Sequence, residues 1–302
     1  MIRGLLSKED KRGESVALLK VNDKIGIIAL SNGLSEGQKQ TMKKLEVTLT
    51  QLGFNVVLPK SLYRTVSVFH ATDKERAAML MDYYKDHQIK AIFDVSGGDL
   101  ANGVLPYLDY QCIKNNPKPF FGYSDLTTVV NAIYHQTNQL TFLYQIRHLV
   151  GQHEKQVVDE FEKTFLLGHS NLFNFEYEWV QGESMKGITI GGNIRCFLKL
   201  AGTPYMPSFK HNILFLESFS GDLAKIATYL NHYKQLGVFD EINGLILGYF
   251  TELEEAGYSQ TLVELVKTIV DNPKLPIVKT AQIGHQSNSK CLIIGKSLSL
   301  GR

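Results

Sequence analysis

The sequence predicts an α/β protein made of a doubly wound parallel sheet domain and a second, smaller mixed α/β domain. Short apolar runs alternate with helical patterns up to about residue 150, which is typical of a parallel sheet covered by helices. After about residue 180 the order of strands and helices changes. The chain has 302 residues, and hydrophobic cores tend to split beyond roughly 250–300 residues. Together these observations favour two domains.

The elements of the first domain each have a local signal. The run IGIIAL at residues 25–30 is apolar without interruption, as in a strand buried on both faces. A helix with one apolar face follows it, and Gly53 stands just after its end as a stop signal. Further strands are predicted over 54–59, 90–98 and 118–123, and a further helix over 73–87.

The second domain is expected after a less regular stretch that contains one helix, over 155–169. The predicted boundaries are an N-terminal arm at 1–20, a first domain at 21–150, a linker at 151–180 and a second domain at 181–302. The strands of the second domain are predicted over 185–190, 212–218, 244–250, 276–285 and 290–296, and its helices over 222–235 and 260–272.

Composition excludes several classes of protein. A formal net charge of +2 gives no general electrostatic reason to bind nucleic acid or an anionic membrane. No apolar run reaches the ~20 residues of a membrane helix, and the first residues lack the apolar core of a signal peptide. We therefore expect a cytoplasmic protein. Three widely spaced cysteines, Cys112, Cys196 and Cys291, are expected to be reduced thiols rather than disulfides or zinc ligands.

Ser124 is the candidate nucleophile. It lies in FFGYSDLTTVVNAIY, where an apolar strand runs into a helix. A tight strand-to-helix turn lifts a serine hydroxyl out of the sheet and places it near free N–H groups at the helix start. The sequence is not G-x-S-x-G, and a serine at this position is also a good helix cap. Position alone leaves both interpretations open.

A glycine-containing loop, DVSGGDLANG, follows the strand at 90–98. Glycine lets the backbone approach a ligand without a Cβ clash. The amides of Gly98 and Asp125 are the candidate oxyanion hole, and Gly97 and Asp99 are candidates for substrate binding. The alternatives are a simple glycine turn or a phosphate-binding loop, but neither G-x-G-x-x-G nor the Walker pattern is present.

Two residues of the second domain complete the candidate site. Glu217 ends the apolar run NILFLES, and His285 follows Gly284 after the run IVKTAQI. A carboxylate can hold a histidine in one tautomer and stabilise its imidazolium. Taken alone, a solvated strand-end charge and a structural histidine are the simpler interpretations of these two residues, and they stay open. Gly192 and Asn193, between a strand and a helix, are further candidates for substrate binding, with packing and capping as the alternative.

Five stretches together resemble the LD-carboxypeptidase family of serine peptidases, which includes murein tetrapeptide carboxypeptidases and microcin C immunity peptidases. They are SGGDLANGVLPYLDY, KPFFGYSDLTT, ITIGGNIRCFLKLAGTPYMP, ILFLES and IGHQ. The resemblance implies a Rossmann-like N-terminal domain and a smaller C-terminal domain with the active site between them. It implies a triad of Ser124, Glu217 and His285, no metal or cofactor, and a homodimer. It also implies cleavage of an amide next to a free carboxylate.

The chain departs from the family pattern in two places that bear on specificity. It has LTFLYQIRHLVG where a Gly-Pro often follows the nucleophile helix, and it has Gln286 and Cys291 after the Gly-His pair. The expected partner is a small peptide or peptidyl-nucleotide substrate, either a murein tetrapeptide or a microcin-like peptidyl adenylate. The alternatives are a non-catalytic peptide-binding protein on the same scaffold and a nucleotide enzyme, which lacks a phosphate fingerprint here.

Overall fold

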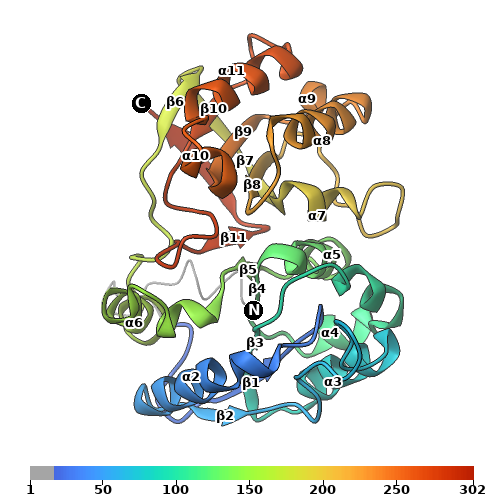
Figure 1. The fold of residues 1–302 in the computed structure, drawn as a ribbon, viewed down its shortest axis with the longest axis vertical. Helices are drawn as coiled ribbons and strands as arrows, with labels where there is room; N and C mark the ends of the chain where they lie inside the picture. Colours follow the sequence, from blue (N-terminus) through green and yellow to red (C-terminus); the bar gives the residue numbers. More distant parts are fainter. Residues whose placement is uncertain (1–16) are drawn as a thin grey trace.

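The computed structural model describes residues 17–302, so the predicted arm at 1–20 lies almost entirely outside the described residues. Two six-stranded sheets stand one above the other, and helices flank each of them (Figure 1). The predicted class, a doubly wound parallel sheet domain plus a mixed α/β domain, is confirmed.

The first sheet has the strand order β11-β5-β4-β3-β1-β2 and is parallel except for β11. Helices α2 and α6 pack on one side, and α3, α4 and α5 on the other (Figure 1). The strands are β1 (Lys24–Ile28), β2 (Asn55–Val57), β3 (Ile89–Asp94), β4 (Phe120–Gly122), β5 (Thr141–Leu143) and β11 (Leu292–Ile294). The helices are α2 (Lys39–Gln51), α3 (Asp73–Lys85), α4 (Tyr110–Asn115), α5 (Thr127–Thr137) and α6 (Glu154–Phe161).

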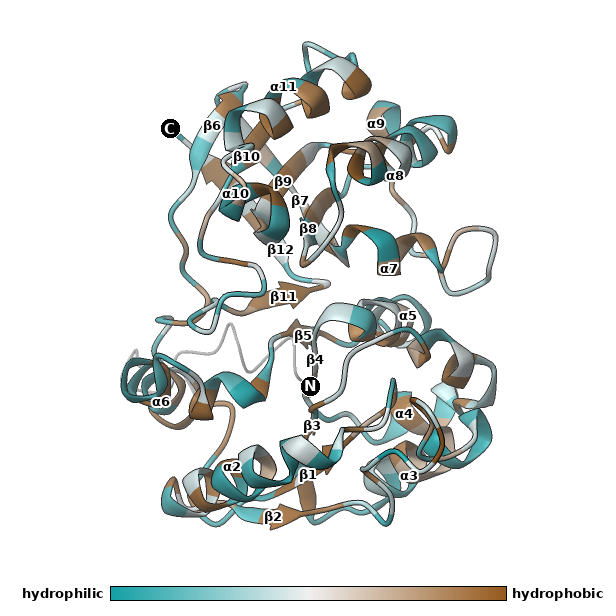
Figure 2. Cartoon of the chain, in the orientation of Figure 1, coloured by the Kyte–Doolittle hydropathy of each residue, from teal (hydrophilic) through white to brown (hydrophobic). Residues whose placement is uncertain are grey.

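The second sheet has the order β12-β7-β8-β9-β10-β6, with parallel inner strands and antiparallel edges. Its strands are β6 (Glu178–Gln181), β7 (Ser184–Asn193), β8 (Ile213–Ser218), β9 (Gly244–Phe250), β10 (Ile277–Lys279) and β12 (Ser297–Gly301). Its helices are α7 (Ile194–Leu198), α8 (Leu223–Gln235), α9 (Val238–Glu241), α10 (Thr251–Glu255) and α11 (Ser259–Val270). Strands β8 and β9 are almost entirely buried, as their unbroken apolar sequences predict. In Figure 2 the inner strands are largely hydrophobic, while the helices that flank the sheets mix hydrophobic and hydrophilic residues.

Two predictions about the C-terminal strands are wrong. The strand expected over 290–296 was assigned to the second domain, but β11 pairs antiparallel with β5 of the first sheet. This short apolar strand is buried and covers an edge of β5 that would otherwise expose unpaired N–H and C=O groups. The strand expected over 276–285 ends at Lys279, because its parallel pairing with β9 stops there. His285 therefore lies in a loop.

Stacked phenylalanines hold the first sheet against α6 and the turn that follows it. The Phe121 ring lies 4.3 Å from that of Phe93 and 4.5 Å from that of Phe142, both nearly parallel, and meets the edge of Phe165 at 5.3 Å. All four side chains are fully buried. Phe121 belongs to β4, and Ser124 lies in the turn that follows this strand. The cluster therefore fixes the strand that leads to the candidate nucleophile.

We predict that Phe121→Ala lowers the free energy of unfolding by about 3–5 kcal/mol, because it removes a buried ring and leaves a cavity. Urea unfolding followed by circular dichroism measures the loss. The matched control is Leu236→Ala at a side chain that is 43% exposed, where we expect a change within about 0.5 kcal/mol. Equal effects of the two substitutions would contradict this account of the core.

Candidate active site

Ser124 occupies a strained position between β4 and α5. It begins the short 3-10 turn η3 (Ser124–Leu126) and has a φ of 57°, in the left-handed region. For a residue other than glycine this conformation costs on the order of 1–3 kcal/mol and is found mainly at functional sites. Neither η3 nor α5 has a side-chain cap hydrogen bond. Helix capping, the simpler interpretation, therefore does not explain the serine.

Glu217 and His285 are in direct contact. Glu217 lies at the end of β8 with a side chain that is 0% exposed, and its Oε2 is 2.6 Å from His285 Nδ1. Its other oxygen, Oε1, accepts a hydrogen bond from Asn193 Nδ2 at 3.1 Å. The interpretation of Glu217 as a solvated strand-end charge is excluded. A buried carboxylate with two donors orients the imidazole and favours the proton on Nδ1.

The other nitrogen of His285, Nε2, is buried and has no hydrogen-bond partner among residues 17–302. His285 and Ser124 line the same small cavity, of about 210 Å³. The rings of Tyr123 and Phe219 flank the imidazole, each with its centroid 5.0 Å away. Ser124 and His285 thus share one cavity, and no hydrogen bond joins the serine hydroxyl to the imidazole. Such hydrogen bonds are often long in unliganded sites and tighten when substrate binds.

The loop after β3 lies beside Ser124. A Cβ placed on Gly97 would be 3.9 Å from Ser124 Oγ. Gly98 has a φ of 125°, and a Cβ there would come within 2.2 Å of the Asn32 side chain, so only glycine fits. Within the described part of the chain, no hydrogen bond is donated by the backbone amide of Gly98 or of Asp125. Two amides at this place could stabilise a developing oxyanion.

Two cations of the second domain contact this loop and the turn that carries Ser124. Arg195 lies on α7, and Lys199 follows that helix directly. Lys199 Nζ lies 2.5 Å from Oδ1 of the fully buried Asp125 and donates to the Asp99 carbonyl at 3.0 Å. Arg195 pairs with the Asp99 carboxylate and donates to the Gly98 carbonyl at 3.3 Å. The hydrogen bond from Arg195 is the main reason that the pKa of Asp99 is lowered. Sequence reasoning did not single out Arg195 or Lys199.

Gly192 and Asn193 make contacts inside the protein. The Asn193 amide donates to Thr127 Oγ1 at 3.0 Å, and its side chain caps α7 as well as holding Glu217. A Cβ on Gly192 would come within 2.5 Å of Thr127 Oγ1, so glycine allows β7 to approach α5 closely. The two residues therefore contact Thr127 and Glu217 inside the protein. Their role in substrate binding stays a prediction.

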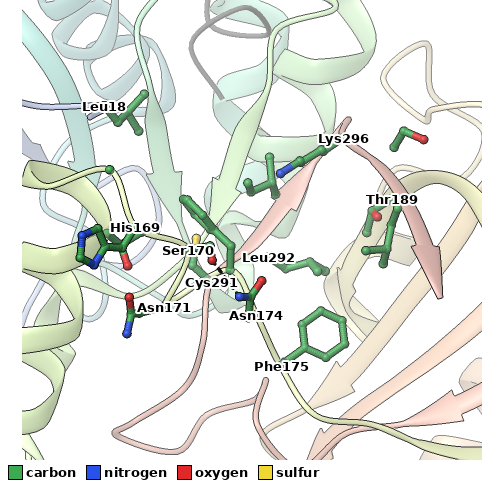
Figure 3. A pocket seen from close by; sticks show the side chains of 16 residues that line it. Leu18, His169, Ser170, Asn171, Asn174, Phe175, Thr189, Cys291, Leu292 and Lys296 are labelled. Carbon is green, nitrogen blue, oxygen red and sulfur yellow. Dashed lines mark hydrogen bonds between the residues drawn. The ribbon is translucent and has the colours of Figure 1, made fainter. Parts of the chain in front are cut away.

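A larger cavity, of about 530 Å³, lies beside β11 (Figure 3). Cys291 and Lys296 are on its wall, and none of the candidate catalytic residues is. Among the residues that the structure describes, no group of His, Cys, Asp and Glu is arranged to hold a metal ion, and no helix is long and apolar enough to cross a bilayer.

Comparison with known proteins gives the family. Residues 25–144 match the LD-carboxypeptidase N-terminal domain, and residues 186–300 match the LD-carboxypeptidase C-terminal domain. The chain belongs to the LD-carboxypeptidase family. It is a serine peptidase, as its sequence resemblance predicted.

Named relatives match nearly the whole chain. The probable murein peptide carboxypeptidase of Bacillus subtilis is 27% identical over 93% of the chain and 90% of its own length. The microcin C7 self-immunity protein MccF of Escherichia coli is 26% identical over 94% and 92%. Among solved structures, an MccF-like protein from Bacillus anthracis matches with a TM-score of 0.83 and 26% identity, covering 94% of each chain. MccF bound to aspartyl sulfamoyl adenosine matches with a TM-score of 0.84 and 24% identity, over 94% of this chain and 95% of that one.

We predict that Lys199→Met destabilises the protein by about 3 kcal/mol, because it leaves the carboxylate of Asp125 buried without its cation. Thermal or urea unfolding measures the loss. The matched control is Lys234→Met, which breaks an exposed pair with Asp271 at 3.7 Å and should cost no more than about 1 kcal/mol. A cost at Lys199 as small as that at Lys234 would show that the contact between the domains is not needed.

Proposed function

We propose that the protein hydrolyses a small peptide or peptide-like amide as a carboxypeptidase, with Ser124 as nucleophile, His285 as general base and Glu217 as the group that orients His285. The observation that carries the proposal is the 2.6 Å contact between the buried Glu217 carboxylate and His285 Nδ1. That contact leaves Nε2 as the free nitrogen in a cavity that Ser124 shares. The strained φ of Ser124 gives independent support.

The proposed reaction is acyl transfer to serine followed by hydrolysis. Ser124 Oγ attacks the carbonyl carbon while His285 Nε2 takes the hydroxyl proton and passes it to the leaving amine. Water then attacks the acyl-enzyme, loses its proton to His285 and releases the acid together with the free serine. The amides of Gly98 and Asp125 stabilise the oxyanion in both steps, and such a donor contributes roughly 3–4 kcal/mol to transition-state stabilisation.

The substrate is proposed to be a murein tetrapeptide or a peptidyl nucleotide of the microcin type. The named relatives support both, since one is a probable murein peptide carboxypeptidase and MccF is solved with aspartyl sulfamoyl adenosine and glutamyl sulfamoyl guanosine. We also propose a cytoplasmic homodimer, which the family resemblance implies. Sedimentation equilibrium measures the oligomeric state.

We predict that Ser124→Ala abolishes turnover and leaves the fold intact, because the variant keeps every contact of the site except the nucleophile. A fluorophosphonate probe should label the wild-type protein and not the variant. Mass spectrometry of products from murein tetrapeptides and aminoacyl sulfamoyl adenylates should show cleavage by the wild type alone. Tight peptide binding by a wild-type protein that neither reacts with the probe nor cleaves would instead favour the non-catalytic binding protein.

We predict that Glu217→Gln lowers kcat by about 10⁴-fold, as the loss of the orienting carboxylate does in serine protease triads. The amide cannot favour the proton on Nδ1 as the carboxylate does, so His285 presents the wrong tautomer to Ser124. Steady-state kinetics on the peptide cleaved by the wild type measures the change. Glu178→Gln, at an exposed residue of β6, is the control, and a similar small effect of both substitutions would remove Glu217 from the mechanism.

A further inference from the structure

Arg147 lies on the wall of the cavity that contains Ser124 and His285. It belongs to the 3-10 turn η4 (Ile146–Val150), which follows β5 at the carboxyl end of the first sheet. The Arg147 amide donates to the Gln145 side chain at 3.3 Å, which fixes the start of the turn. Its side-chain Nε is buried and has no hydrogen-bond partner within residues 17–302. The arginine as a whole is only partly buried, but a buried donor atom without an acceptor is costly unless a ligand supplies one.

Arg147 makes no direct ion pair with a carboxylate of the described residues. None of the ion pairs formed between described residues includes it, and no carboxylate is on the described wall. Burial lowers the pKa of Arg147, with Asp94 acting against that effect, but a guanidinium stays charged at neutral pH. The carboxylate of Asp94 is itself fully engaged, since its oxygens accept hydrogen bonds from the Leu30 amide and from Ser96.

The neighbouring histidine adds no charge of its own. Burial, together with the charges of Arg147 and His285, lowers the pKa of His148 to about 3. At neutral pH Arg147 is therefore a permanently charged cation on the described wall of the cavity that Ser124 also lines. A guanidinium binds a carboxylate through two parallel hydrogen bonds, which an amide or an ester cannot replace.

We propose that Arg147 binds the free carboxylate of the residue that cleavage releases. The enzyme would thereby select peptides in which a single C-terminal residue follows the scissile amide. This proposal rests on the proposed function. His285 must deliver a proton to the leaving nitrogen, so the leaving residue lies beside His285, in the cavity that Arg147 also lines. The cavity volume of about 210 Å³ is below the roughly 300–1,000 Å³ of pockets for drug-sized ligands. It has room for one small residue.

The turn that carries Arg147 lies between the two ranges that match the family models, residues 25–144 and 186–300. Ser124, Glu217 and His285 lie within those ranges. The arginine therefore comes from a part of the chain that the family models do not cover.

Binding to the inactive enzyme tests the proposal without depending on turnover. In the Ser124→Ala background, isothermal titration calorimetry is carried out with a murein tetrapeptide that has a free C-terminal carboxylate and with the same peptide as its C-terminal carboxamide. We expect the acid to bind about 100-fold more tightly than the amide, within the range found when one partner of a hydrogen-bonded charge pair is removed. Adding Arg147→Met should bring the acid down to the affinity of the amide.

Two further variants keep the test decisive. Arg147→Lys retains the charge but loses the planar fork, so we expect an intermediate preference, and this holds even if the methionine variant fails to fold. Arg64→Met, at an exposed arginine outside the cavity, should leave the preference unchanged. Equal binding of acid and amide to the Ser124→Ala protein, or a preference that survives both substitutions of Arg147, would overturn the proposal. Failure of the proposed hydrolase function would appear separately, as a wild-type protein that the fluorophosphonate probe does not label.

Discussion

The contact between Glu217 and His285 is the interaction on which the rest of the site depends. A carboxylate with no solvent exposure is stable only when donors replace the water it has lost. Here the donors are His285 Nδ1 and Asn193 Nδ2, one for each oxygen. The apolar strand β8 needs no charge for its own packing, and the end of that strand fixes the carboxylate rigidly. The loop that carries His285 can therefore take its orientation from Glu217 rather than from regular structure.

The candidate nucleophile Ser124 comes from the other sheet, so the site also requires that the two sheets keep one relative position. Three kinds of contact fix it. The amide of Asn131 on α5 donates to and accepts from the backbone of Gly191 on β7, at 2.8 and 3.0 Å. Lys199 and Arg195 hold the loops around Ser124 by charge. Strand β11 belongs to the C-terminal part of the chain but pairs with β5 at the edge of the first sheet. Together these contacts hold α5 and the loops around Ser124 against the second sheet.

The sequence predicts the parts of this arrangement that depend on local pattern. Unbroken apolar runs identify β1, β3, β8 and β9, and a serine, a glutamate and a histidine next to such runs identify the candidate site. The three-residue strand β5 and the edge strands β6 and β12 were missed because they are too short or too polar to show a period. Lys199 was missed because its partner Asp125 lies 74 residues away, and only the folded chain brings the two together. Arg147 gave no signal either, since the cavity it lines is formed by segments far apart in the sequence.

The candidate site combines rigidly held groups with a wall that a short turn supplies. Glu217 is fixed by the end of β8 and by donors from His285 and Asn193. The cavity wall at η4 is different, because a short turn after a strand can carry other residues without moving the sheet. Under the proposal for Arg147, this turn selects the anion that the cavity accepts, while the proposed proton transfer between Ser124 and His285 depends on other elements. We therefore expect a substitution in the turn after β5 to change specificity more than it changes the proposed chemistry at the ends of β4 and β8.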